Sequence, residues 1–325
     1  MPRAVNGAVS FHHRITDWSA PASCVVILLL FLVPTWPASA QSPPESDAAA
    51  SGGGASLAET GAKLSNPTSN VWALFTEFDL VFNNGNANRG DDKVGSLMNF
   101  QPVLPFPLFG EGEEQWKLIV RPAVPILFAS PRPDGNDTNY DHGLSDFLFP
   151  MLLVPSEKVT GSNLIFGAGP AFVLPTSTKT ELGQRQWQAG PAAVLGYKTK
   201  DYVVGVFPQY FFGVGGRGDQ GSDIENASNM NLLYFGFLNL PNAWQIGMNP
   251  VITYNHKASR GNKWNVPIGI VIAKTTNVGG LPVKFQLGAE YSVVSQDDFG
   301  KRALFKLNII PVIPALIGNP IFGGG

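Results

Sequence analysis

Residues 283–291 read Val-Lys-Phe-Gln-Leu-Gly-Ala-Glu-Tyr, with an apolar residue at every odd position and a polar residue or glycine at every even position. Successive side chains of a β-strand point to opposite faces, so this period of two predicts a strand between an apolar and a polar environment. The same period recurs along the chain beside connections rich in Gly and Asn, and almost no stretch has helical spacing. An apolar face could pack on an ordinary core, but a closed barrel in lipid explains the repetition best.

The composition agrees with a strand-built membrane protein. The chain has 325 residues, of which 14% are charged and 44% hydrophobic, and this is too apolar for a disordered chain. No run of eighteen apolar residues follows the leader, which argues against helical membrane spans, whereas a transmembrane strand leaves only a weak hydropathy signal. The sequence has no basic patch with interleaved aromatic residues, so nucleic acid is not an expected partner.

The first residues are typical of an export signal. Basic residues precede an apolar run over residues 25–33, and Ala38-Ser39-Ala40 offers a small-residue cleavage site. Residues 1–40 are therefore predicted to be a signal peptide. Its removal takes away Cys24, the only cysteine, and with it disulfides, Cys-ligated zinc and thiol catalysis. Residues 41–65 begin with a stretch rich in Ser, Ala, Gly and Pro and are expected to form a disordered periplasmic segment.

The rest of the chain predicts an all-β fold, a transmembrane antiparallel up-and-down β-barrel of about twelve strands over residues 66–311, with a C-terminal tail over residues 312–325. The connections alternate between short and long, as they do in outer-membrane barrels. An even strand number places both termini on the periplasmic side of the outer membrane of a Gram-negative bacterium. The strands are expected near residues 71–83, 94–106, 115–128, 143–154, 162–174, 186–198, 201–213, 228–239, 243–255, 263–275, 281–292 and 301–311.

Tryptophans and prolines recur at particular depths of these strands. Tryptophans that open strands favour aromatic girdles at the lipid headgroups over ordinary half-buried aromatics: Trp72, Trp116, Trp187, Trp244 and Trp264. Proline removes a donor from the strand ladder, so bulges or local openings of the sheet are expected where it occurs. These places are Gln101-Pro102, Arg121-Pro122, Gly169-Pro170, Gly190-Pro191, Asn249-Pro250 and Val266-Pro267.

Short motifs around these prolines resemble those of a family of Gram-negative outer-membrane barrels. They are Leu64-Ser65-Asn66-Pro67, Asn99-Phe100-Gln101-Pro102-Val103, Arg121-Pro122-Ala123-Val124-Pro125-Ile126, Gly167-Ala168-Gly169-Pro170-Ala171-Phe172 and Gln188-Ala189-Gly190-Pro191-Ala192. Members of this family are commonly labelled transporters, sometimes misnamed neuromedin U, and are similar to the phenol-degradation meta-pathway barrel group. The resemblance implies a transport role, extending to apolar or aromatic solutes, and no catalytic residues. Asp146 stands where relatives tend to have a Gly-Asp pair.

Positions opposite the apolar ones are expected to face the lumen, and the resemblance adds Asp146 to them. They are Glu77, Asp79, Asn99, Gln101, Lys117, Arg121, Gln245, Asn249, Lys284, Gln286, Glu290, Lys306 and Asn308. Such charges could line a water-filled passage, or they could pair and close a narrow barrel. A passage for passive movement of small solutes is favoured, because twelve strands lie between the filled eight-stranded barrels and the open sixteen-stranded porins. The alternative is a non-conducting structural or surface-binding barrel.

Two chemical alternatives carry less weight. His142 and Ser145, with Asp141 or Asp146, could form the triad of a lipid hydrolase, but no Gly-x-Ser-x-Gly turn accompanies them. Residues 134–141 are rich in oxygen ligands for calcium but lack the glycine and closing glutamate of an EF-hand. We therefore expect no enzyme, no cofactor and no metal. The expected partners are outer-membrane lipid, lipopolysaccharide, a small-molecule solute and the barrel-assembly machinery.

Overall fold

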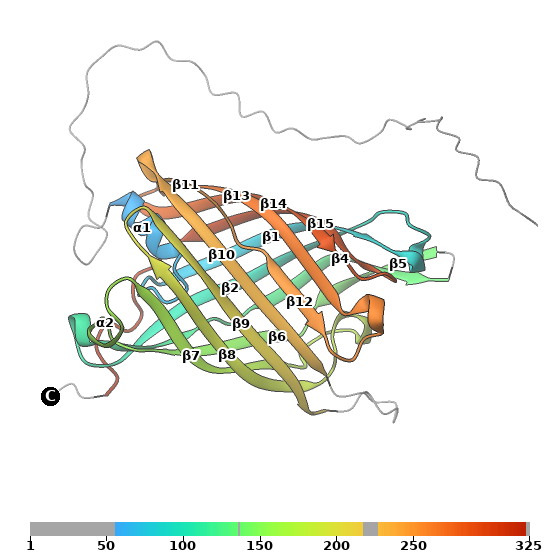
Figure 1. The fold of residues 1–325 in the computed structure, drawn as a ribbon, viewed down its shortest axis with the longest axis horizontal. Coiled ribbons are helices and arrows are strands. Elements are labelled where there is room, and N and C mark those ends of the chain that lie inside the picture. Colours follow the sequence, from blue (N-terminus) through green and yellow to red (C-terminus); the bar gives the residue numbers. More distant parts are fainter. Residues whose placement is uncertain (1–55, 136, 217–226, 323–325) are drawn as a thin grey trace, which may run out of the picture. The chain divides into compact units, whose positions relative to one another are not determined.

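The first strand of the protein pairs with the last. The computed structural model describes residues 56–135, 137–216 and 227–322. All its strands join in one antiparallel sheet, in which β1 (Ala73–Asn84) pairs with both β2 (Lys93–Phe109) and β15 (Gly300–Pro311). This pairing closes the sheet, so the protein is all-β with a twelve-stranded antiparallel barrel (Figure 1). The predicted fold class is confirmed.

Three of the barrel strands are interrupted and therefore carry two labels each. They are β3 (Trp116–Val120) with β4 (Val124–Asp134), β5 (Asp137–Leu144) with β6 (Phe147–Val154), and β11 (Trp244–Met248) with β12 (Val251–Asn255). The remaining strands are β7 (Leu164–Leu174), β8 (Trp187–Lys198), β9 (Tyr202–Gly215), β10 (Ser228–Leu240), β13 (Trp264–Val278) and β14 (Leu281–Val294).

Prolines account for two of the interruptions. Pro122 lies between β3 and β4, and Pro250 lies between β11 and β12. A proline nitrogen cannot donate to the neighbouring strand, so the ladder opens there. Pro267 follows a register shift between β13 and β14, which is a bulge. Pro102, in contrast, sits within an unbroken ladder to β1. The ladder between β6 and β7 skips Pro170 and the ladder between β8 and β9 skips Pro191, so the sheet opens or bulges at five of the six predicted places.

The connections fall into two groups at opposite ends of the barrel. Short ones hold η2 (Gly112–Glu114), α2 (Glu157–Thr160) and η4 (Pro241–Ala243), and longer ones hold η1 (Asn86–Asn88), η3 (Thr180–Leu182) and η5 (Arg260–Asn262). We call these the short-turn end and the long-loop end. No helix among the described residues is long and apolar enough to cross a membrane.

The outer surface of the barrel is apolar. Along β13, Ile270 and Ile272 are 52% and 51% exposed, whereas Val271 and Ala273 between and after them are 2% exposed. In a closed barrel the exposed set points outward and the buried set inward. Isoleucine suits such a pleated surface, and apolar side chains exposed in a band indicate contact with lipid rather than water.

The predicted aromatic girdle is only partly reproduced. Trp187, Trp244 and Trp264 are about half exposed, at 51%, 45% and 43%, as side chains at a lipid interface are. Trp72 is only 4% exposed and packs edge-on against Phe106, with ring centroids 5.3 Å apart. The exposed girdle position predicted for Trp72 is therefore wrong, because this residue precedes the first strand and is buried against Phe106.

The interior has an apolar half and a polar half. Buried apolar side chains project from β7 to β10, among them Ile165, Val194, Phe207, Phe235 and Phe237. Buried polar side chains project from β13 to β15, namely Asn265, Thr275, Lys284, Gln286, Glu290, Ser292, Lys306 and Asn308. The inner wall is therefore mainly apolar over β7 to β10 and rich in hydrogen-bonding side chains over β13 to β15.

The C-terminal tail continues beyond the barrel. Val312 bridges to Ala73, and the chain then crosses to β2, where the backbone nitrogen of Ile321 donates to the carbonyl of Pro107 at 3.0 Å. That part of β2 lies beyond Val103, its last partner position with β1. The described part of the tail, residues 312–322, thus covers a strand edge that β1 leaves unpaired.

Candidate functional site

A helix and a turn occupy the short-turn end of the barrel interior. α1 (Leu57–Leu64) begins at Ser56, whose side-chain oxygen accepts a hydrogen bond from the backbone nitrogen of Glu59 at 3.2 Å. This is a standard N-terminal cap. Residues 64–69 after it are all buried, and α1 contacts β11, β13, β14 and η4. We call residues 56–72 the lumen plug (Figure 1).

The lumen plug corrects two predictions. Residues 57–65 were expected to be disordered, but they form α1 and its cap, while residues 41–55 lie outside the described residues. The barrel was expected from residue 66, but residues 66–72 belong to the plug and the first strand begins at Ala73. The plug is ordered by hydrogen bonds to the barrel wall and by the packing of Leu64 and Val71 with Ala73 and Ile310. The local composition could not reveal these distant partners. The predicted signal peptide also lies outside the described residues.

α1 packs against β13 at a glycine. A Cβ atom added to Gly61 would lie 2.5 Å from Oγ1 of Thr275, and Thr275 is only 1% exposed. Real side chains do not tolerate such a distance, so any other residue at position 61 must displace either the threonine or the helix. The close approach of the plug to the wall therefore depends on this glycine.

Lys284 of the neighbouring strand β14, which pairs with Thr275, also holds the plug. Its Nζ donates to Oγ of Ser65 at 2.5 Å and to the carbonyl oxygen of Gly61 at 3.2 Å. It also lies 5.1 Å from the ring centroid of Phe237. The side chain is fully buried, at 0% exposed. Lys284 thus bonds to the end of α1 at both a hydroxyl and a backbone carbonyl.

Ser65 also bonds to a second residue of the barrel wall. Its hydroxyl donates to Oε1 of Gln245 at 3.2 Å, and Nε2 of Gln245 donates to Oδ1 of Asn239 at 2.6 Å. After the helix, Oδ1 of Asn66 accepts from both the nitrogen and the hydroxyl of Thr68, each at 3.0 Å. Every bond in this set is polar and non-covalent, and none joins two opposite charges.

The predicted charged residues of β14 and β15 form an ion network. Lys306 Nζ lies 2.6 Å from Oε1 of Glu290, and Lys301 Nζ lies 3.4 Å from its Oε2. The Glu290 and Lys306 side chains are each only 4% exposed. Next to them, Nδ2 of Asn308 donates to Oε2 of Glu77 at 2.8 Å. This network fills part of the polar half of the interior.

Three other predicted residues keep a buried acceptor oxygen without a hydrogen-bond partner among the described residues. These are Oδ1 of Asp79, Asn99 and Asn249. Gln286 is buried beside the plug, at 4% exposed, and Gln101 is half-buried in β2. Asp146 lines a cavity at the long-loop end and also fixes a loop, since its carboxylate accepts from the backbone nitrogens of Ser177 and Gln184 at 3.1 and 2.6 Å.

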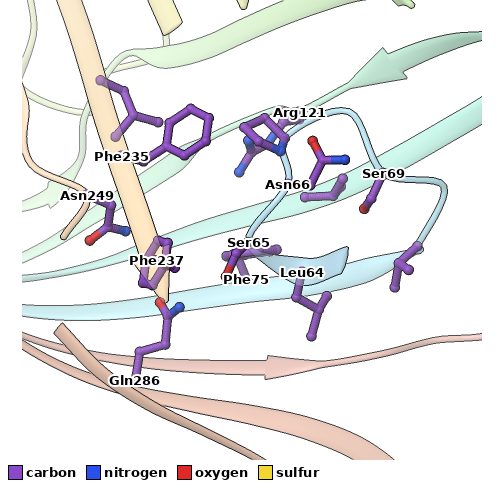
Figure 2. A pocket seen from close by; sticks show the side chains of 14 residues that line it. Leu64, Ser65, Asn66, Ser69, Phe75, Arg121, Phe235, Phe237, Asn249 and Gln286 are labelled. Atoms are coloured by element: carbon purple, nitrogen blue, oxygen red, sulfur yellow. The ribbon is translucent and has the colours of Figure 1, made fainter. Parts of the chain in front are cut away.

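Cavities lie at both ends of the barrel interior and against the plug. At the long-loop end a cavity of about 520 Å³ is lined by residues that include Gln188, Asn231 and Tyr254. At the short-turn end a cavity of about 410 Å³ is lined by Lys117 and the plug residue Asn70, among others. Between them, a pocket of about 60 Å³ lies between the plug and the wall (Figure 2). We call this the plug pocket.

Sequence reasoning missed the aromatic lining of the plug pocket. Phe75, Phe235 and Phe237 line it together with the predicted residues Arg121 and Asn249. The motif Leu64-Ser65-Asn66-Pro67 was visible, but nothing in the sequence placed it inside the barrel. The alternation of Phe235 and Phe237 was a signal for one strand face. It could not show which face looked inward.

The proposed hydrolase and calcium residues are engaged in other contacts. The Ser145 hydroxyl donates to the carbonyl of Leu182 at 2.5 Å rather than to His142, which is exposed. The Asp141 carboxylate bonds to Arg132 Nε at 3.4 Å and Lys179 Nζ at 3.1 Å. Within the described ranges, no group of three or more His, Cys, Asp or Glu side chains could hold a metal ion.

Comparison with solved structures supports the fold. The protein is similar to an outer-membrane channel from Pseudomonas putida F1, at 11% identity and a TM-score of 0.58, over 75% of this chain and 96% of that one. The NanC porin matches at 9% identity and a TM-score of 0.44, over 74% and 99% of the two chains. The toluene transporter TodX of Pseudomonas putida matches at 12% identity and a TM-score of 0.24, over 77% and 92%.

At 11% identity, the likeness to the Pseudomonas putida F1 channel shows a shared barrel fold. Nothing further is concluded from the matches with TM-scores of 0.44 and 0.24. No protein-family model and no curated protein matches the sequence. The finer family labels suggested by the motifs, neuromedin U and the phenol-degradation group, have no support in these comparisons.

Proposed function

We propose that the protein is an outer-membrane channel for the passive passage of small solutes, and that the lumen plug controls the opening of its path. One observation carries this proposal: the plug lies between a cavity of about 520 Å³ at the long-loop end and one of about 410 Å³ at the short-turn end, and within the described residues Lys284 bonds to it through neutral acceptors alone. Each such bond contributes little net free energy, on the order of 1–3 kcal/mol. The plug can therefore leave without unfolding the barrel.

The plug pocket marks the narrowest part of the proposed path. Asn231 lines the larger cavity and Leu233, two positions along the same face of β10, lines the pocket. On the other side, the plug residues Asn66 and Ser69 line both the pocket and the short-turn cavity. A solute that crosses the barrel would therefore pass between β10 and the plug, along the apolar half of the interior. This geometry favours apolar or aromatic solutes.

The orientation and the partners follow from the same fold. Short turns characterise the periplasmic end of outer-membrane barrels, so we propose that the plug faces the periplasm. The exposed apolar band would contact outer-membrane lipid, with lipopolysaccharide at the long-loop end. The barrel-assembly machinery would insert the folded barrel. We further propose that the buried polar residues of β13 to β15 line the polar side of the path.

Single-channel recording in planar bilayers tests the proposal. Purified protein is expected to give discrete open levels separated by long closures, because the plug occupies the lumen for most of the time. A folded protein that gives no openings would support the alternative, a non-conducting structural barrel. That alternative draws on the ion network around Glu290 and on the small volume of the plug pocket, about 60 Å³.

A further inference from the structure

Arg121 places an unpaired cation against the plug pocket. It lies at the break between β3 and β4, where its backbone nitrogen donates to the carbonyl of Pro150 at 3.1 Å. Its guanidinium lies 5.5 Å from the ring centroid of Phe75. Across the parts of the chain that the structure describes, the guanidinium has neither a hydrogen-bond acceptor nor a carboxylate partner. A guanidinium carries five donors, so its bonding capacity is unused.

The surroundings of Arg121 differ from those of the other interior cations. Lys306 and Lys301 lie 2.6 and 3.4 Å from the carboxylate of Glu290, and Lys284 donates to two acceptors of the plug, whereas no acceptor lies at the guanidinium of Arg121 among the described residues. The residues that line the plug pocket, in contrast, include one cation and no acid. A charge held away from water without a counter-charge is unfavourable, so the pocket provides a favourable position for an anion that enters it.

The rest of the lining is aromatic. Phe235 and Phe237, each 4% exposed, project from β10 on one side, and Phe75 lies on the side of Arg121 and the plug (Figure 2). Aromatic rings pack against one another edge-on or offset, and such contacts add to the free energy of burying the ring. Three phenylalanines around a small space therefore favour a planar apolar group.

Asn249 adds a polar group to this lining. Its Oδ1 is buried and has no hydrogen-bond partner among the described residues. The pocket has a volume of about 60 Å³ and is not enclosed, so a ring, which fills about 150 Å³ when fully enclosed, would extend from the pocket into the neighbouring lumen. The ligand is therefore small, with one anionic end toward Arg121 and a ring toward the phenylalanines.

We propose that the plug pocket binds small aromatic carboxylates and that Arg121 is the residue that selects them. The guanidinium fork matches the two oxygens of a carboxylate and donates to both. The phenylalanines hold the ring. This inference rests on the proposed channel function and names the class of solute that pauses in the path.

Calorimetric titration of the detergent-solubilised full protein with benzoate and with benzamide tests the selection. The two ligands share ring and shape but differ in charge. We expect benzoate to bind about tenfold or more tightly, as a hydrogen bond to a charged group implies. Equal binding of the two ligands would overturn the proposal. This comparison uses the unaltered protein and so does not depend on the folding of a variant.

Variants then test whether the preference for benzoate depends on the charge of Arg121. Arg121→Met should remove the preference for benzoate over benzamide, and Arg121→Lys should retain part of it because the charge stays while the fork is lost. Lys117→Met is the matched control, since Lys117 is a cation of the neighbouring segment β3 that lines the short-turn cavity but not the plug pocket. Loss of the preference in Lys117→Met and not in Arg121→Met would contradict the assignment.

The outcome is separable from that of the channel proposal. Binding in detergent needs no open path. A protein that binds benzoate preferentially but never conducts would therefore refute the channel function and support the binding site. A protein that conducts but binds benzoate and benzamide equally would refute the binding site and support the channel function.

Discussion

Lys284 Nζ lies 2.5 Å from Ser65 Oγ, so that a buried cation of the barrel wall is bonded to the end of the plug helix through a neutral hydroxyl. Its second acceptor, the carbonyl of Gly61, is also uncharged. No carboxylate pairs with Lys284 among the described residues. A buried cation without a counter-charge stabilises a barrel poorly. The arrangement is suited to hold a removable segment.

Removing this cation should open the channel. In Lys284→Met the plug loses two hydrogen bonds from a charged donor, each worth about 1.5–3 kcal/mol, while methionine fills the space. We expect the open probability in planar bilayers to rise about tenfold or more. Lys274→Met is the control, because Lys274 is a half-buried residue of β13 whose cation lies over Trp244 and makes no bond to the plug among the described residues. Equal opening of both variants would show that general charge loss is responsible.

Adding bulk at position 61 should displace the plug. Gly61→Leu places a side chain where a single Cβ already lies 2.5 Å from Oγ1 of Thr275. The exposed position Ala58 on the same helix offers the control Ala58→Leu. We expect maleimide labelling of an added Ser69→Cys, a buried plug position, to become fast with Gly61→Leu and to stay slow with Ala58→Leu. Slow labelling in both would mean that α1 does not depend on close contact with β13.

The ion network should show strong coupling. Glu290→Gln leaves Lys306 and Lys301 without their shared carboxylate, whereas Lys306→Met leaves Glu290 with Lys301. Breaking a buried pair costs about 3–5 kcal/mol, so we expect Glu290→Gln to lower the free energy of unfolding by this amount and Lys306→Met to lower it less. The double variant should lose less than the sum. Urea unfolding in detergent measures all three, and simple additivity would argue against a coupled pair.

The lipid face can be tested on neighbouring strands. Leu287 of β14 is 65% exposed and pairs with Leu307 and Ile272, so Leu287→Arg should lower the free energy of unfolding in lipid by about 2–4 kcal/mol. Val278→Arg, at a 52% exposed site on the outward face beside the short turn after β13, should cost about 0–1 kcal/mol. Equal costs at the two sites would contradict the assigned depth of Leu287 in the bilayer.

The strands could be predicted because their signal is local. All twelve expected segments correspond to barrel strands, and the openings at Pro122 and Pro250 follow from the missing proline donor. Trp72 was misplaced because an aromatic residue beside a strand looks the same in sequence whether it is exposed to lipid or covered by other side chains. The plug was missed for a similar reason, since residues 57–65 carry a weak helical pattern and acquire their partners only from Gln245, Thr275 and Lys284, about two hundred positions away.

The sequence by itself determined that the chain alternates between two environments, because side-chain direction reverses at every residue of a strand. That local rule was sufficient for an antiparallel barrel of about twelve strands. Only the tertiary structure decided what fills the barrel. Closure of the sheet allows Ser65 to bond to Lys284 and places Arg121 in the same pocket as the phenylalanines of β10. Closure brings together residues whose distance along the chain hides their contact.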